Sequence, residues 1–132
     1  MQIRSAKDLT VYKKAYELAI EVFHSSKNFP IEERYSLIDQ MRRSSRSVCS
    51  NLRESWAKRR YEAHFVSKLT DADGENGEIE TWLDFAHDAG YLSKSEHAVL
   101  AEKCAEIGAM LGSMIRDPSS FILKRSVKAP DR

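Results

Sequence analysis

The stretch LIDQMRRSSRSVCSNLRESWAKRRY, residues 37–61, places small or apolar side chains three or four positions apart along most of its length. This spacing puts them on one face of an α-helix, so the stretch predicts an amphipathic helix that buries that face. We expect the helix to run from about Ile31, after the break at Pro30, to Ala57. The residues predicted to face inward are Leu37, Ile38, Met41, Ser45, Val48, Leu52 and Trp56.

Three other segments carry the same helical period. They predict helices over about residues 9–27, 60–88 and 93–116, with Asp8 and Ser93 placed to cap the first and the last of them. The predicted inner positions of these three helices are, in order, Tyr12, Ala15, Ala19, Val22, Phe23 and Ser26; Phe65, Leu69, Ala72, Ile79, Leu83 and Ala86; and Leu100, Cys104, Ile107, Leu111, Met114 and Ile115.

The four predicted helices are joined by short connections, and no strand pattern or internal repeat interrupts them. Short connections place consecutive helices side by side in opposite directions. The sequence therefore predicts an all-α protein, an antiparallel up-and-down four-helix bundle over residues 1–123. Residues 124–132 are polar and are expected to form a tail outside the bundle.

The composition excludes several classes of protein. A chain of 132 residues fits a single domain, and no apolar run approaches the roughly 18 residues that a membrane-spanning helix needs. The first residues, MQIRSAKDLT, lack the apolar stretch of a secretory signal. Cys49 and Cys104 are the two cysteines, which is too few for a disulfide framework and fits a reducing compartment. We expect a cytoplasmic protein with no membrane partner.

The charges are unevenly distributed although the net charge is only +1. Residues 42–60 hold seven basic side chains against one acid, Glu54, which gives +6. Residues 71–106 hold ten acids against Lys94 and Lys103, which gives −8. Such an asymmetry concerns partners and assembly rather than the fold.

Two sets of side chains suggest contacts between subunits. On the second predicted helix, Arg42 and Arg46 come within reach of an acidic stripe on the third, and the pairing can form either within the bundle or across subunits. On the fourth, small residues line up beside the core face, and their close neighbour is either another helix of the bundle or a second subunit. Together these features favour a homo-oligomer, with a predicted interface of Arg42, Arg46, Asp71, Glu75, Glu78, Gly108 and Gly112.

The remaining basic residues gather near the turn between the second and third helices. Basic side chains interleaved with aromatic rings can bind single-stranded nucleic acid through phosphate contacts and stacking. The alternative is that Trp56 closes the end of the core and the charges are simply solvated. The candidate nucleic-acid site, which we call the turn cluster, consists of Arg53, Trp56, Lys58, Arg59, Arg60 and Tyr61.

No constellation of residues predicts catalysis or a bound cofactor. Glu21 and His24 match part of the di-iron motif of some helical bundles, but helical geometry points them away from the predicted core face. Cys49 and Cys104 lie at helical positions typical of buried thiols, with no histidine close in sequence. We therefore predict no enzyme activity, no metal, no cofactor and no small-molecule substrate.

Three stretches resemble a known family: DLTVYKKAYEL at 8–18, FPIEERYSLIDQMRRSSRSVCSNL at 29–52 and EIETWLDFAHDAGYL at 78–92. They are similar to the bacterial four-helix-bundle proteins called 23S rRNA intervening-sequence proteins. The resemblance implies an antiparallel bundle, assembly into a ring that is expected to be a pentamer, and no known enzyme activity.

Two functional hypotheses follow. The first is a ring-forming, non-enzymatic bundle that binds RNA or a ribonucleoprotein partner through the turn cluster, with a contribution from Lys124, Arg125 and Lys128. The second is a protein-interaction or scaffold module with no nucleic-acid role.

Overall fold

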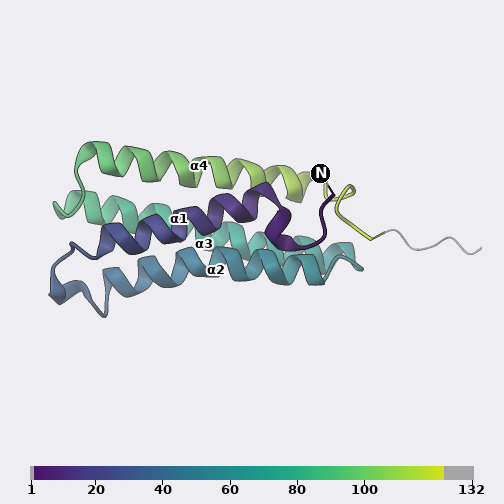
Figure 1. The fold of residues 1–132 in the computed structure, drawn as a ribbon, viewed down its shortest axis with the longest axis horizontal. Coiled ribbons are helices and arrows are strands. Elements are labelled where there is room, and N and C mark those ends of the chain that lie inside the picture. The colour runs from purple at the N-terminus through teal and green to yellow at the C-terminus, as the bar shows by residue number, and fades with distance from the viewer. Residues whose placement is uncertain (1, 124–132) are drawn as a thin grey trace, which may run out of the picture.

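The structure is a computed structural model that describes residues 2–123. Within this range the chain forms four α-helices and no strand: α1 (Thr10–Ser26), α2 (Leu37–Ala57), α3 (Glu62–Asp88) and α4 (Lys94–Arg116). Two 3₁₀ turns, η1 (Ala6–Asp8) and η2 (Ile31–Glu33), precede α1 and α2. Successive helices lie side by side and reverse direction, and α4 also packs along α1 (Figure 1). The predicted all-α architecture with four helices is confirmed.

The start of α4 and the end of α3 follow local rules that the sequence displays. The Ser93 hydroxyl accepts a hydrogen bond from the Glu96 amide at 3.1 Å, and the Glu96 carboxylate accepts one from the Ser93 amide at 2.8 Å. This reciprocal pair is the predicted capping box. Gly90 has a φ of +84°, the left-handed conformation that ends many helices and favours glycine. These two features produce the tight reversal between α3 and α4.

The beginnings of α1 and α2 differ from the predictions. Asp8 does not cap α1: its carboxylate accepts from the amides of Arg4 and Ser5 at 2.8 and 3.2 Å and closes η1 instead. The second helix begins at Leu37, six residues later than expected, because Ile31–Glu33 folds as a 3₁₀ turn.

The Glu33 carboxylate holds the segment before α2 in place. It accepts hydrogen bonds from the hydroxyl of Ser36 at 2.6 Å and from the phenol of Tyr91, on the far turn, at 2.9 Å. Both hydrogen bonds lower the pKa of Glu33, and the bond from Ser36 has the larger effect. A tertiary contact of this kind can override the helical preference of a short segment.

The core agrees closely with the sequence along α3 and α4. All six predicted inner residues of α3 are buried, as are five of the six on α4, where only Ile115 is partly exposed. On α2, Leu37 and Trp56 are half-buried at the two ends of the inner face, and the five predicted residues between them are buried. No helix of the described chain is long and apolar enough to cross a membrane.

Helix α1 is turned relative to the prediction. Its buried residues are Val11, Ala15, Leu18, Val22 and Ser26, and the predicted Tyr12, Ala19 and Phe23 lie at the boundary with α2. Apolar side chains cover more of α1 than the core can bury. Consequently Tyr16 and Ile20 are 55% and 44% exposed.

Candidate nucleic-acid interface

The turn cluster lies where α2 passes into α3. Helix α2 ends as the Lys58 amide bonds to the carbonyls of Glu54 and Ser55, at 3.1 and 3.0 Å. The Tyr61 amide then bonds to the Lys58 carbonyl at 3.2 Å, and α3 begins at Glu62. The reversal is so short that its residues, three of them basic and one aromatic, all lie at one end of the bundle (Figure 1).

Packed side chains support this turn. Phe65 is completely buried, and its ring stacks on that of Phe121 with centroids 6.1 Å apart. The Leu123 amide donates to the Arg59 carbonyl at 3.1 Å, so the chain after α4 returns to the turn. The three further basic residues of the functional hypothesis, Lys124, Arg125 and Lys128, lie outside the described residues.

Arg59 and Trp56 form one unit within the turn cluster. The Arg59 guanidinium lies 3.5 Å from the centre of the Trp56 ring, and its Nε donates to the Trp56 carbonyl at 2.8 Å. Burial lowers the pKa of Arg59. Trp56 itself packs against the core. The indole therefore closes this end of the bundle, as the alternative interpretation expected, and Arg59 covers one face of its ring.

The other cations of the turn cluster are exposed. Arg53, Lys58 and Arg60 are exposed, and within residues 2–123 none of them forms an ion pair. The acid of this segment, Glu54, forms an ion pair with Lys68, with 2.9 Å between the Lys68 Nζ atom and the Glu54 carboxylate. Tyr61 is 50% exposed, with its ring against His64. The turn thus presents three free positive charges beside an accessible aromatic ring.

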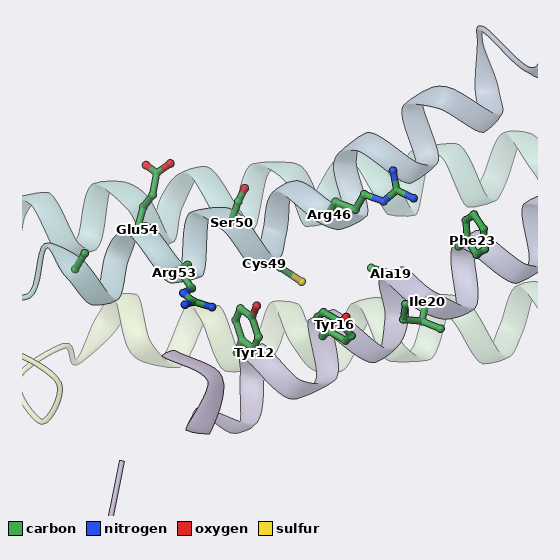
Figure 2. A pocket seen from close by; sticks show the side chains of 11 residues that line it. Tyr12, Tyr16, Ala19, Ile20, Phe23, Arg46, Cys49, Ser50, Arg53 and Glu54 are labelled. Carbon is green, nitrogen blue, oxygen red and sulfur yellow. The ribbon is translucent and has the colours of Figure 1, made fainter. Parts of the chain in front are cut away.

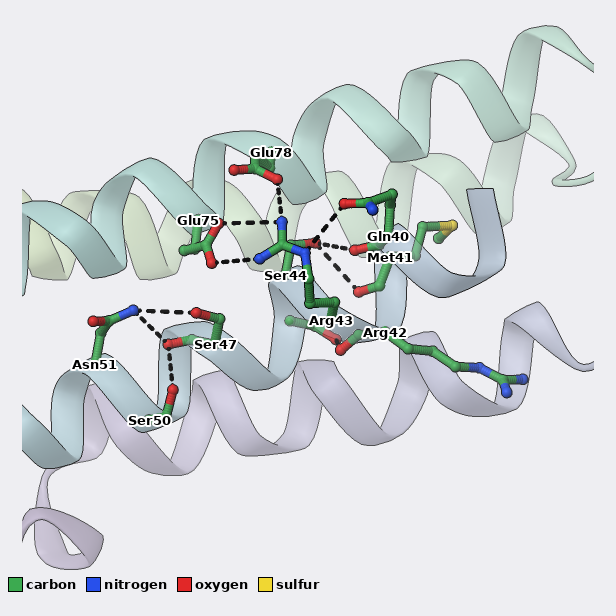
Figure 3. Close-up of polar contacts among 11 residues, drawn as sticks. Gln40, Met41, Arg42, Arg43, Ser44, Ser47, Ser50, Asn51, Glu75 and Glu78 are labelled. Carbon is green, nitrogen blue, oxygen red and sulfur yellow. Dashed lines mark hydrogen bonds and ion pairs between the residues drawn. The ribbon is translucent and has the colours of Figure 1, made fainter. Parts of the chain in front are cut away.

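The arginines nearer the start of α2 have partners. Arg43 donates to Glu75 at 2.8 Å and to Glu78 at 2.5 Å, both on α3 (Figure 3). The hydrogen bond to Glu75 is the main cause that raises the pKa of Arg43. Arg42 turns to α1 instead, where its Nε donates to the Ser26 hydroxyl at 2.9 Å.

Arg43 therefore takes the place that helical spacing predicted for Arg42 and Arg46. One residue rotates the side chain by about 100° around a helix. Arg42 and Arg46 lie on the side of α2 that faces α1, with their guanidinium carbons 4.6 and 6.0 Å from the centre of the Phe23 ring. Within the single chain neither Arg42 nor Arg46 pairs with the acidic stripe, and their pairing across subunits stays a prediction. Asp71, also in the predicted interface, lies 3.5 Å from the Nζ of Lys68.

The predicted small stripe on α4 makes its close contact inside the bundle. A Cβ atom on Gly108 would lie 3.3 Å from the Asn76 Nδ2 atom of α3, and that Nδ2 donates to the Cys104 carbonyl at 2.9 Å. A Cβ atom on Gly112 would lie 3.2 Å from the Arg116 Nη1 atom of the same helix. Within the chain the close neighbour of Gly108 is α3, and contact of this stripe with a second subunit stays a prediction.

The residues considered for metal and thiol chemistry are dispersed or buried. The described chain brings no three His, Cys, Asp or Glu side chains together in a metal-binding arrangement. Glu21 pairs with Lys103 at 2.5 Å. Burial raises the pKa of Cys49 to about 11 and that of Cys104 to about 12, which disfavours the reactive thiolate.

A groove between α1 and α2 is a feature that the sequence reasoning did not identify. It has a volume of about 800 Å³. Tyr12, Tyr16, Ile20 and Phe23 lie along its α1 side (Figure 2). Across from them on α2 are Arg46, Cys49, Ser50 and Arg53. The signal available in the sequence was the excess of apolar residues on α1, which extends beyond one helical face.

The comparisons with known proteins agree on one family. Residues 7–113 match the model of the 23S rRNA-intervening sequence protein family. A crystal structure of a protein of unknown function from the S23 ribosomal protein family of Bacteroides thetaiotaomicron superposes with a TM-score of 0.74. Its sequence is 28% identical, and the match covers 83% of this chain and 98% of that one. No curated protein matches. The chain belongs to the 23S rRNA-intervening sequence protein family.

Proposed function

We propose that this protein is a non-enzymatic, ring-forming bundle that binds single-stranded RNA, alone or within a ribonucleoprotein, through the turn cluster. The observation that carries the proposal is a contrast in pairing along α2. Arg43 is bound to two carboxylates, whereas Arg53, Lys58 and Arg60 are exposed and form no ion pair within the described residues. Free cations grouped at one end of a rigid bundle suit a phosphate backbone.

In this proposal the residues of the turn cluster have different roles. Arg53, Lys58 and Arg60 contact phosphates. Tyr61, half-exposed at the start of α3, offers a ring on which a base can stack. Arg59 and Trp56 support the site from below, because Arg59 is held on the indole and on the Trp56 carbonyl. This arrangement favours contact with the backbone and general stacking over the reading of a particular sequence.

Assembly would strengthen such a site. Three cations on one chain give modest affinity, but several copies in a ring bring several turn clusters to one RNA, and linked sites bind with greater avidity. The family resemblance supports a ring, with five subunits as the proposed number. A cytoplasmic location completes the proposal, since RNA and ribonucleoproteins are abundant there.

The test measures binding of a fluorescent single-stranded RNA by anisotropy over a range of salt concentrations. For Lys58→Ala/Arg60→Ala, two exposed cations that do not line the groove between α1 and α2, we expect about tenfold weaker binding, and a salt slope smaller by about 1.4, since each phosphate contact on a single strand contributes about 0.7. Arg43→Ala is the matched control, because it removes a cation from α2 that is already paired. Unchanged binding of the double variant, or equal loss in the control, would contradict the proposal.

A scaffold role is the second candidate, and the exposed apolar groove between α1 and α2 is the observation that favours it. Pull-down from native lysate with and without RNase separates the two functions. Partners that stay bound after RNase treatment favour the scaffold, and partners lost on treatment favour RNA binding.

A further inference from the structure

The groove between α1 and α2 has the pattern of a helix-docking seam. Tyr12, Tyr16, Ala19 and Phe23 recur every three or four residues along α1, and Ile20 lies beside them. This is the spacing with which one helix receives another. Tyr16 and Ile20 are 55% and 44% exposed, although α1 is otherwise packed against the bundle. Contiguous apolar surface of this kind typically marks an interaction site.

The α2 side of the groove is basic. Arg46 and Arg53 line it, and Figure 2 shows both side chains on the α2 wall, across from the aromatic residues of α1. The acid in the lining, Glu54, is bound to Lys68. The occupant that fits is therefore apolar at its centre and acidic at its margin.

The same chain carries a surface with those properties. Leu37 at the start of α2 and Trp82, Phe85 and Ala89 at the end of α3 line a notch of about 350 Å³. Phe85 is 60% exposed. Of the described residues that line the notch, one is acidic, Glu33, and none is basic. On α3, Asp88 follows Phe85 by nearly one helical turn and adds a second acid, whereas Glu78, one turn before Trp82, is bound to Arg43 and is not counted. We call these residues the acidic aromatic patch.

We propose that the acidic aromatic patch of a second copy of this chain docks into the groove between α1 and α2. The two surfaces differ and are opposite in charge, so the contact is head-to-tail. Placing two grooves against each other would instead bring Arg46 and Arg53 of one copy against the same arginines of the other. A head-to-tail contact either closes into a ring or continues as a filament.

The positions of the two surfaces favour closure. The groove lies on the α1–α2 side of the bundle and the patch on the neighbouring α2–α3 side. Each added copy is therefore turned relative to the one before it, which favours a ring of a few subunits. The inference rests on the self-assembly in the proposed function, and it names the two surfaces that meet.

The test uses one variant for each surface. Ile20→Lys and Phe85→Glu each remove an apolar side chain from the middle of one surface and put in its place a charge that docking would have to strip of water, so each change should weaken the contact. Val99→Glu, on α4 and 52% exposed, is the matched control. Size-exclusion chromatography with light scattering at micromolar concentration measures the mass. Helical content and thermal midpoint show whether each variant is folded.

We expect the unmodified chain and Val99→Glu to be assembled, and each single variant to be mainly monomeric. An equimolar mixture of Ile20→Lys and Phe85→Glu should form a dimer with one copy of each, because one intact groove and one intact patch remain. If Phe85→Glu alone remained a dimer, the grooves would pair with each other and the proposal would be wrong. A monomeric unmodified chain, or a mixture that stays monomeric, would also overturn it.

The same variants keep failure of this contact separate from failure of RNA binding. Ile20→Lys and Phe85→Glu leave every residue of the turn cluster in place. If assembly follows the expected pattern while no variant binds the labelled RNA, the RNA proposal fails and the contact stands. If the variants bind RNA but the mixing pattern is absent, the contact fails and the RNA proposal stands.

Discussion

The first half of α2 and the turn at its end carry the same kind of side chain in opposite surroundings. Arg43 donates to two glutamates of α3, and Arg42 reaches a serine hydroxyl and an aromatic ring of α1. At the turn, Arg53 and Arg60 are exposed and form no ion pair in the described part of the chain. Side chains of neighbouring helices bind the arginines of the first region, whereas those of the second region have no such partner in the described residues. The number of arginines therefore says less about function than what each one faces.

The exposed position of the cations at the turn depends on the packed core beneath it, and Phe65→Ala should disrupt that packing. The ring is completely buried and stacks on Phe121. Truncating a buried phenylalanine typically costs about 3–5 kcal/mol. We expect a loss of this size in the free energy of unfolding measured with urea. Val99→Ala is the control, because that side chain is 52% exposed and lies outside the proposed subunit contact, so its truncation should cost well under about 1 kcal/mol. Equal losses would show that the turn is not anchored through Phe65.

The paired region should respond to Arg43→Ala in stability, whereas the turn should not respond to Arg60→Ala. Removing Arg43 leaves Glu75 without its strongest partner, and the Glu75 side chain is only 15% exposed. Charged hydrogen bonds contribute about 1.5–3 kcal/mol, but solvent screens an arginine that is 44% exposed. We expect a loss of about 1 kcal/mol.

The unfolding free energy of Arg60→Ala is compared with that of Arg43→Ala. Arg60→Ala should stay within about 0.5 kcal/mol of the unmodified chain, as is usual for exposed positions. Adding Glu75→Gln to Arg43→Ala should recover part of the loss, because the unpaired charge is removed. A larger effect at Arg60 than at Arg43 in chemical unfolding would reverse our assignment of the two regions.

The sequence predicted the helices and most of the core because burial there follows a single period. Phe65, Leu69 and Leu83 on α3 fall on one narrow face, and the structure buries all three. Helix α1 was harder, because apolar residues occupy more than one face. Periodicity alone could not decide whether Leu18 or Phe23 turns inward.

The candidate sites were predictable only in part. The basic character of the turn is plain in the sequence, but the stacking of Arg59 on Trp56 depends on rotamers that no spacing rule provides. Whether Arg42 or Arg43 faces α3 depends on a shift of one residue along α2. The pairing of two helices inferred from the position of their connecting turn is less accurate than one residue. The groove between α1 and α2 needed both helices in place before it could be recognised.

The smallest effect that separates the two regions is their response to acid. Burial, the largest single influence, raises the pKa of Glu75, but hydrogen bonds from Arg43 and Ser47 outweigh it and leave that pKa below 4.5. Glu78 has a raised pKa, chiefly because it shares a hydrogen bond with Glu75.

The signs of these two shifts are opposite. A carboxyl with a lowered pKa in the folded state contributes stability above 4.5, and that stability is lost as the pH falls through its folded pKa. A carboxyl with a raised folded pKa has the reverse effect, so protonating Glu78 relieves a small destabilisation just above 4.5. The paired region should therefore gain slightly in stability as Glu78 takes up its proton and lose stability at lower pH, when Glu75 does.

The measurement is the difference in unfolding free energy between the unmodified chain and Arg43→Ala, followed from neutral to acidic pH. We expect this difference to shrink below pH 4.5, because protonated Glu75 no longer needs the arginine. The corresponding difference for Arg60→Ala should not change over the same range, because no carboxylate pairs with Arg60 within residues 2–123. If the Arg60 difference changed with pH as much as the Arg43 difference, an acid would be neutralising the turn, and the free charges assigned to RNA would not be free.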